Sequence, residues 1–343
     1  MMADLGPAEL VAGIVLVALT AYVLLGGADF GGGVWDLLAS GPRKREQRAL
    51  IAEAIGPIWE ANHVWLILVI VVLFTCFPVA FARLAIGLHI PLSLMLIGIV
   101  LRGSAFTFRS HYGHSGEHDD TAGTSQHWGR IFAIASVGTP VMLGLCVSAL
   151  AAGTLRPPGR AAFYESYVGP WLTPFGVGVG FLTLALFAFL AAVYLTVEAR
   201  QWALQEDFRR RALGAAAAVF VTAFGTLGLA LLGAPLMGRG LTTAPWAPAL
   251  HLATGVTAVI AIWALWSRRF RLARVAAAAQ ISLILWGWAL AQYPYLIPPD
   301  LTIRAAAAPR ITLVLSLWTL GLGTLVLFPS LIYLFRVFKP APR

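Results

Sequence analysis

Nine apolar runs of about 20 residues each limit what this chain can fold into. A run of that length, coiled as an α-helix, matches the hydrocarbon thickness of a bilayer. Charged residues make up only 11% of the 343 residues, whereas soluble domains carry about 25%. The sequence therefore predicts an all-α, polytopic protein with one integral-membrane domain over residues 1–343. The expected spans are 9–34, 54–77, 83–106, 129–152, 172–197, 213–234, 249–267, 275–293 and 309–335.

The positively charged residues predict the orientation of the chain. Nine spans put the two termini on opposite sides of the membrane. Of the 24 Lys and Arg residues, 18 fall on the side that contains the connections 35–53 and 198–212, and six fall on the other side. By the positive-inside rule, the side with 18 faces the cytoplasm. We therefore expect an external N-terminus and a cytoplasmic C-terminus, and the net charge of +9 gives no reason to expect nucleic acid as a partner.

A weak internal repeat suggests how the helices are grouped. Tyr22 precedes Asp29 in the first span, and Tyr194 precedes Glu198 in the fifth. Both spans are expected to run from outside to inside, as in parallel repeats of membrane proteins. We therefore expect two four-helix units plus one additional helix. These parts would comprise residues 1–152, 172–293 and 309–335.

Two carboxylates lie at a matched depth in the first two spans. Asp29 stands among five glycines in the segment 26–33, a composition that lets neighbouring backbones approach closely. With the first span centred near Tyr22, Asp29 lies about 10 Å towards the cytoplasm. Glu60 lies about 9 Å from the centre of the second span on the same side. Because charged groups inside a membrane cost free energy, each of these acids needs a partner or a function.

Further titratable residues extend this pattern along the second span. Glu53 precedes Glu60 by seven residues, and His63 follows Glu60 by about one helical turn, so the three form a ladder towards the membrane centre. Burial raises the pKa of a carboxylate and lowers that of histidine, which suits both groups to proton transfer. The alternatives are an ion pair in which Arg102 of the third span neutralises Asp29 or Glu60, and a ligand-binding role.

Metal and haem ligation receive little support from the sequence. The expected connection 107–128 contains four histidines, but a flexible loop of this kind usually binds metal only adventitiously. His63 is expected in the inner half of the membrane, whereas His89 and His251 are expected in the outer half, so His63 has no partner at its depth. The two cysteines form no Cys-x-x-Cys motif. We expect no catalytic residue, metal site or haem ligand in this chain.

Four segments together resemble subunit II of cytochrome bd-type quinol oxidases. The most specific is Pro57-Ile58-Trp59-Glu60-Ala61-Asn62-His63-Val64-Trp65-Leu66, whose Glu and His are closer to the cyanide-insensitive branch. The others are Gly26 to Gly33 with Asp29, Arg102 followed by Phe108-Arg109, and Tyr293-Pro294-Tyr295-Leu296. The resemblance covers nearly the whole chain and implies a location in the bacterial plasma (inner) membrane.

The resemblance also implies a function. Such complexes oxidise membrane quinol, reduce dioxygen to water and take the protons from the cytoplasm. Haems b and d belong to the partner, subunit I, whereas subunit II binds no haem, supports assembly and helps to deliver protons to the haem site. Glu60 matches the family's acidic uptake residue and Asp29 the acid of the first-span motif. Leu25 stands where some members have a second acid, which puts that step of the route in doubt.

Other expectations concern ligands and alternatives. Membrane quinol and lipid are expected to contact the complex, and some members contain a structural quinone or a small accessory subunit. The same buried acids would also suit a proton-coupled secondary transporter, which requires a central substrate site and helices broken at mid-membrane. A second alternative is a self-sufficient membrane cytochrome b, which would show a haem absorption band in the chain purified alone.

Overall fold

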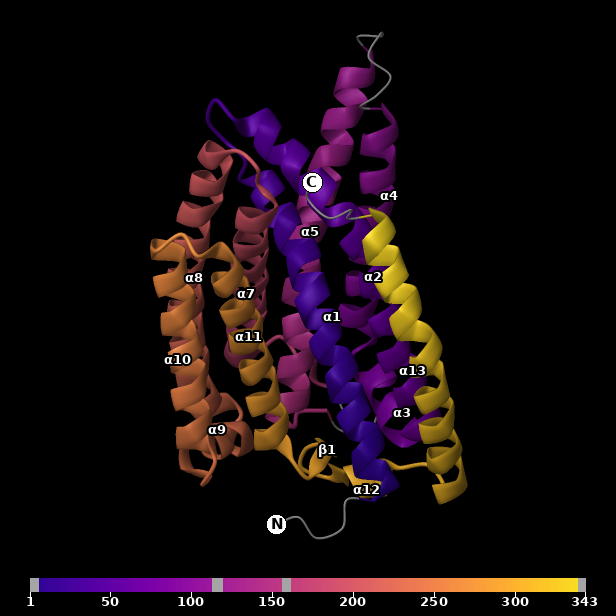
Figure 1. Cartoon of the computed structure of the whole chain (residues 1–343). Helices are drawn as coiled ribbons and strands as arrows, with labels where there is room; N and C mark the ends of the chain where they lie inside the picture. Colours follow the sequence, from indigo (N-terminus) through magenta and orange to yellow (C-terminus); the bar gives the residue numbers. More distant parts are fainter. Residues whose placement is uncertain (1–5, 113–119, 156–161, 339–343) are drawn as a thin grey trace.

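The computed structural model describes residues 6–112, 120–155 and 162–338, with side chains described for 6–55, 61–108, 128–155 and 162–334. Long helices run side by side as a bundle, and the start of the first and the end of the last lie at opposite ends of it (Figure 1). The elements are α1 (Pro7–Leu37), α2 (Lys44–Cys76), α3 (Pro78–Gly87), α4 (His89–Tyr112), α5 (Asp120–Ala152), α6 (Phe163–Tyr167), α7 (Pro174–Glu198), α8 (Trp202–Gly233), α9 (Pro235–Thr243), α10 (Ala247–Trp266), α11 (Phe270–Gln292), β1 (Tyr295–Ile297), β2 (Leu301–Thr302), α12 (Ile303–Ala306) and α13 (Arg310–Phe338).

The described helices confirm a polytopic all-α membrane protein. Eight are long and apolar enough to cross a bilayer, or nine if the bent pair Ala61–Cys76 and Pro78–Gly87 counts as one span. The bend between these two segments is 118°. It falls at Pro78, where the proline ring and its missing N–H prevent the preceding helix from continuing. The expected start of the third span at residue 83 was therefore wrong, because the structure begins that helix, α4, at His89.

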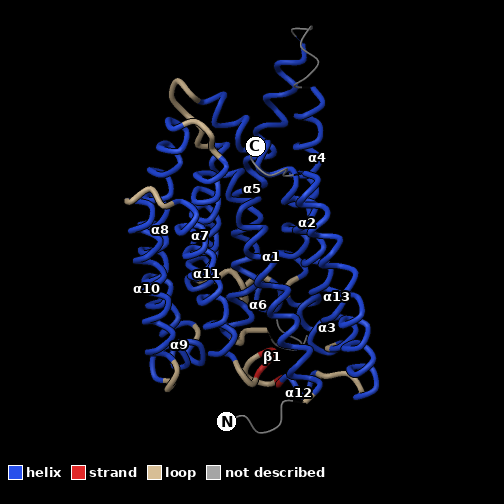
Figure 2. The backbone as a smooth tube through the Cα atoms, in the orientation of Figure 1, coloured by secondary structure: helices blue, strands red, loops and turns tan. Residues whose placement is uncertain are grey.

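Short elements close the end of the bundle from which α1 starts. The small α9 and α12 lie there, together with the two strands β1 and β2 (Figure 2). These strands pair antiparallel, with Tyr295 opposite Thr302 and Ile297 opposite Leu301. The prolines of this segment favour an extended path, and part of that path forms the β1–β2 hairpin. At the opposite end, α2 and α8 begin about ten residues before the expected spans.

Helix α1 lies at the centre of the packing and contacts α2, α5, α7, α11 and α13. Its glycines make this approach feasible. A Cβ atom at Gly31 would lie only 2.0 Å from the Phe187 carbonyl oxygen of α7, so no side chain fits there. The Trp35 indole N–H donates a 2.7 Å hydrogen bond to the Ala188 carbonyl, also of α7. The two-unit repeat stays a prediction.

Candidate functional site

The main polar feature of the interior is an ion pair between α1 and α4. Asp29 is 0% exposed and Arg102 is 2% exposed. Arg102 Nη1 donates to Asp29 Oδ2 at 2.6 Å, and Nη2 donates to Oδ1 at 2.7 Å. Nη2 also donates to the main-chain oxygen of Asp29 at 2.7 Å. This two-pronged contact is the strong form of an arginine–carboxylate interaction. Of the two acids that Arg102 was predicted to neutralise, the structure pairs it with Asp29.

Helix α5 completes the shell around the guanidinium. Arg102 Nε donates to Ser136 Oγ at 2.9 Å, and that hydroxyl donates to the Phe132 carbonyl at 2.7 Å. The guanidinium carbon lies 4.8 Å from the ring centre of Phe30 and 4.9 Å from that of Phe132, within cation–π range. A Cβ atom at Gly33 would lie 2.1 Å from Ser136 Oγ, so this glycine makes room for the serine. The sequence analysis did not identify Ser136.

The chemistry of the pair follows from this geometry. Arginine stays protonated in proteins, and the Asp29 carboxylate is the counter-charge of Arg102. A buried pair adds little net stability compared with an apolar replacement, but removing one partner typically costs about 3–5 kcal/mol. The pair therefore acts first as a fixed, neutral link between α1, α4 and α5.

Glu53, the described carboxylate of the predicted ladder in α2, lies at the surface, whereas Asp29 is buried. Glu53 is exposed and Ile67 is 59% exposed, whereas Asn62 is only 2% exposed and faces α1. His63 is half-buried. The Glu60 side chain lies outside those that the structure describes. Helical spacing alone puts position 60 on the face shared by Glu53 and Ile67. The structure thus brings Asp29 and Arg102 together, and it leaves Glu53 and Ile67 exposed on α2.

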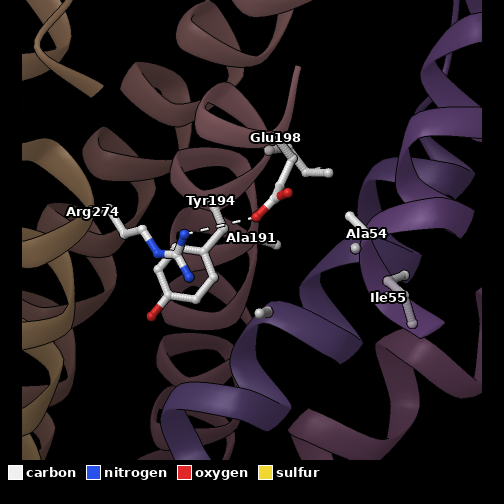
Figure 3. Close-up of a pocket in the computed structure, with 9 residues that line it drawn as sticks. Ala54, Ile55, Ala191, Tyr194, Glu198 and Arg274 are labelled. Atoms are coloured by element: carbon white, nitrogen blue, oxygen red, sulfur yellow. Dashed lines mark ion pairs between the residues drawn. The ribbon is translucent and has the colours of Figure 1, made fainter. Parts of the chain in front are cut away.

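A second polar cluster lines a small pocket between α1, α2, α7 and α11 (Figure 3). Arg274 Nη1 lies 3.7 Å from Glu198 Oε1, and its guanidinium carbon lies 4.6 Å from the ring centre of Tyr194. Ala54 and Ile55 of α2 lie across from Arg274 (Figure 3), and Ala28 and Gly32 of α1 also line the pocket. Tyr194 and Glu198 entered the sequence analysis only through the weak repeat. Their contact with Arg274 depends on the packing of α11 on α7, which no local motif shows.

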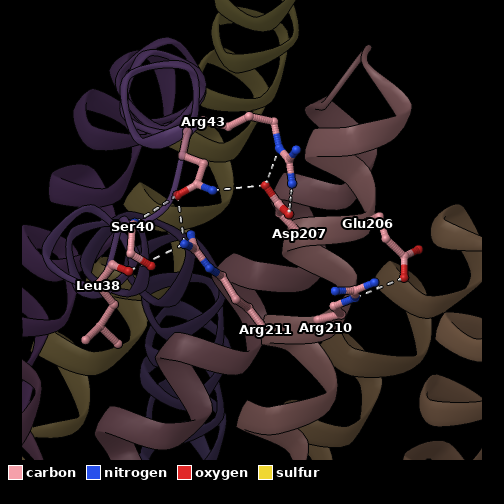
Figure 4. Close-up of polar contacts among 8 residues, drawn as sticks. Leu38, Ser40, Arg43, Glu206, Asp207, Arg210 and Arg211 are labelled. Carbon is pink, nitrogen blue, oxygen red and sulfur yellow. Dashed lines mark hydrogen bonds and ion pairs between the residues drawn. The ribbon is translucent and has the colours of Figure 1, made fainter.

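A third polar cluster fastens the α1–α2 connection to α8 (Figure 4). Arg43 donates to both carboxylate oxygens of Asp207, at 2.6 and 2.8 Å. Gln47 Nε2 donates to Asp207 at 2.9 Å, and Arg211 Nη2 donates to Gln47 Oε1 at 2.8 Å. The ion pair with Asp207 raises the pKa of Arg43 above its ordinary value. These contacts hold the expected cytoplasmic ends of two helices together.

The histidines considered as ligands have other contacts where they are described. His89 Nδ1 lies 2.8 Å from the Ile86 carbonyl, and His251 Nε2 lies 2.7 Å from the Leu241 carbonyl. Over the described part of the chain, no three His, Cys, Asp or Glu side chains gather closely enough to hold a metal ion. The side chains of the four histidines in the segment 107–128 lie outside the described part.

A family comparison decides the relationship that these features suggest. The model of the family described as cytochrome bd terminal oxidase subunit II matches residues 7–338. The chain belongs to this family. The resemblance that the sequence motifs predicted is therefore confirmed, and the subunit II family is one of multi-pass proteins of the inner membrane. The comparisons give no support to a transporter.

Relatives and a solved structure agree with the subunit II assignment. Cytochrome bd ubiquinol oxidase subunit 2 of Bacillus subtilis (strain 168) is 28% identical over 176 residues, 51% of this chain and 48% of the relative. Cytochrome bd-I ubiquinol oxidase subunit 2 of Escherichia coli (strain K12) is 26% identical over 185 residues, 53% of this chain and 46% of the relative. The chain thus spans about half the length of these curated relatives.

The fold similarity extends over the full length of the chain. A chain in the structure of bd oxidase from Geobacillus thermodenitrificans matches with a TM-score of 0.80 and 21% identity. The match covers 98% of this chain and 99% of the other. At this level of identity the comparison shows the fold alone, and the role of each residue has to be argued from the site.

Proposed function

We propose that this chain is the non-haem subunit II of a bd-type terminal oxidase that oxidises membrane quinol and reduces dioxygen to water. In this proposal the chain supports assembly and delivers cytoplasmic protons to the haem site of subunit I, which carries haems b and d. Family membership over residues 7–338 supports the type of complex. A structural quinone and a small accessory subunit stay predictions.

The role in assembly rests on the buried ion pair. Arg102 connects α4 to the Asp29 side chain and main chain of α1 and to Ser136 of α5. Such hydrogen bonds to charged groups contribute about 1.5–3 kcal/mol each when they are buried. Three helices that would otherwise slide on apolar contacts are thereby held in one register. Subunit I would then dock on a preformed surface.

The role in proton delivery rests on the open face of α2, which is the observation that carries the proposal. Glu53 and Ile67 are exposed along this face, and helical spacing adds position 60 to it. A carboxylate directed at hydrocarbon costs free energy. We therefore infer that subunit I, rather than lipid, covers this part of α2. The ladder of Glu53, Glu60 and His63 would then run along the boundary between the two subunits.

Helix α13 extends the proposed docking surface. It packs against α1 and α2, yet only 6% of its apolar 18-residue stretch is buried. Leu315, Trp318 and Leu322 are 58%, 69% and 63% exposed, at the spacing of one helical face. Helix α10 also exposes Leu252 and Val259, but it packs against α8, α9 and α11 rather than against α1 and α2, so we assign its open face to lipid.

The charge distribution indicates the direction in which protons would move along α2. The side with 18 Lys and Arg residues contains the start of α2, so the positive-inside rule makes Glu53 the cytoplasmic end of the ladder. Glu60 lies about 10 Å further in, at 1.5 Å per residue. Steps of that length need bridging water or side-chain motion. The Asp29–Arg102 pair stays neutral beside this route and gives a passing proton no net charge to oppose it.

The test uses the purified two-subunit complex and the Glu60→Gln substitution. Quinol-driven oxygen consumption should fall by about tenfold or more, because loss of a proton-transfer group typically costs 10²–10⁴-fold in a rate-limiting step. Subunit yield and the haem absorption spectrum should stay unchanged. Glu46→Gln is the matched control, since Glu46 is an exposed acid in the first turn of the same helix. Normal turnover of Glu60→Gln would remove Glu60 from the route.

A further inference from the structure

We propose that ordered water molecules are bound between α1, α2 and α5, on the side of the Asp29–Arg102 pair expected to face the outer half of the membrane. The polar atoms of Tyr22, Asn62 and Thr139 would hold this water. The inference deepens the proposed proton route and rests on it, because the water would extend a polar path beyond the ladder of α2.

Three buried polar atoms carry this inference. Tyr22 is 1% exposed, and Asn62 and Thr139 are each 2% exposed. The atoms Tyr22 Oη, Asn62 Oδ1 and Thr139 Oγ1 have no hydrogen-bond partner within the described part of the chain. Buried polar atoms without partners are costly and rare in native proteins. Where protein partners are lacking, ordered water usually satisfies such atoms.

Tyr22 of α1 and Asn62 of α2 both lie along one stripe of α1 residues. Tyr22, Gly26 and Asp29 follow each other at intervals of four and three residues, so they share a helix face. A Cβ atom at Gly26 would lie 3.0 Å from Asn62 Nδ2, so the Asn62 side chain occupies the space beside α1 one turn from Asp29. The Tyr22 hydroxyl interacts electrostatically with both Asp29 and Arg102. All of these groups therefore belong to one polar neighbourhood.

The third atom approaches from α5. Thr139 lies one turn beyond Ser136, the residue that binds Arg102. A Cβ atom at Gly98 would lie 2.3 Å from Thr139 Oγ1, and Gly98 is one turn before Arg102 on α4. The threonine hydroxyl is thus directed at α4 on the same side of the ion pair as Asn62 and Tyr22.

The chemistry of the three atoms selects water as the ligand. A bound water needs two to four polar partners, and two hydroxyls plus an amide oxygen supply both donors and acceptors. A cation would meet the guanidinium of Arg102 nearby, and the only acid of this group, Asp29, already pairs with it. An anion would lack a free positive charge. Glycines at positions 26 and 98 make room for the Asn62 and Thr139 side chains that would hold the water.

Radiolytic footprinting of the intact two-subunit complex in H₂¹⁸O tests this directly. X-ray pulses generate hydroxyl radicals from water, and bound water oxidises the side chain beside it. Phe187 is the matched control, because it is an equally buried aromatic residue at 1% exposure and packs against the glycines of α1. We expect Tyr22 to incorporate ¹⁸O several-fold faster than Phe187. Equal, slow labelling of the two rings would overturn the proposal.

The Asn62→Leu variant makes the test specific to the proposed position. Leucine has a similar volume and no amide oxygen, so Tyr22 labelling should fall to the level of Phe187. Unchanged labelling in this variant would also refute the site, because the water would then lie elsewhere. The outcome is independent of the Glu60→Gln experiment. Slow turnover of Glu60→Gln with an unlabelled Tyr22 would leave the proton route standing and reject the water site, whereas the opposite pair of results would do the reverse.

Discussion

Replacing Arg102 by methionine tests whether the buried pair holds the helices together. Methionine keeps much of the side-chain length but removes the three hydrogen bonds to Asp29 and the one to Ser136. The Asp29 carboxylate would remain at a site that is 0% exposed, and no other described side chain donates a hydrogen bond to it. Burying an uncompensated charge in this way typically costs about 3–5 kcal/mol.

The reverse substitution should be milder, and the difference follows from the geometry. In Asp29→Asn, Arg102 keeps the main-chain oxygen of residue 29, Ser136 Oγ and two aromatic rings. The amide oxygen can still accept one hydrogen bond. The expected loss is about 1–3 kcal/mol, as for one hydrogen bond to a charged group. Adding Asp29→Asn to Arg102→Met should restore part of the lost stability, since a neutral amide replaces the stranded carboxylate.

Thermal unfolding of the purified complex, followed by tryptophan fluorescence, provides the assay. Domains of 150–250 residues lose about 2–4 °C per kcal/mol, so Arg102→Met should lower the melting temperature by on the order of 10 °C. The double variant should melt above Arg102→Met alone. Unchanged melting of Arg102→Met, or a double variant that melts below both single variants, would refute the argument that the pair is a structural link.

Three further predictions follow from the same structure. Gly31→Ala should destabilise the complex by about 1–3 kcal/mol, because the added methyl group would lie 2.0 Å from a main-chain oxygen. Gly13→Ala on the same helix, where a Cβ atom would have no neighbour within 4 Å, is the control and should melt normally. Equal melting of the two variants would contradict the packing account. Asp207→Asn should lower the stability by only about 1 kcal/mol, because its partner Arg43 is 38% exposed and screened by solvent. Limited proteolysis should nevertheless cut the α1–α2 connection faster in this variant. An unchanged cleavage rate would argue against a role of Asp207 in holding that connection to α8. Deleting residues 112–125 should leave oxygen consumption intact and a chelator should not inhibit it; inhibition by the chelator would restore the metal hypothesis.

Hydrophobic length and charge asymmetry predicted much of the fold. Each span reads directly from the sequence because a helix must satisfy its own backbone in hydrocarbon. The boundaries were less secure. The segment 84–87 is as apolar as the span that follows it, and only the structure assigns it to α3, with a break at Leu88 before α4 begins. Helices α2 and α8 likewise continue into water, where hydropathy no longer marks them.

The features of the candidate site likewise divide into those that the sequence predicted and those that only the structure decided. The sequence by itself determined that Asp29, Glu60 and Arg102 lie within or beside apolar spans and therefore need partners, since charge in hydrocarbon is costly wherever it occurs. Only the tertiary structure decided that Arg102 pairs with Asp29, that Ser136 joins them from α5, and that Glu53 and Ile67 are exposed on α2. Those contacts depend on how helices rotate and pack against each other. Small residues such as Gly33 set that packing, and their effect is invisible until the neighbouring helix is in place.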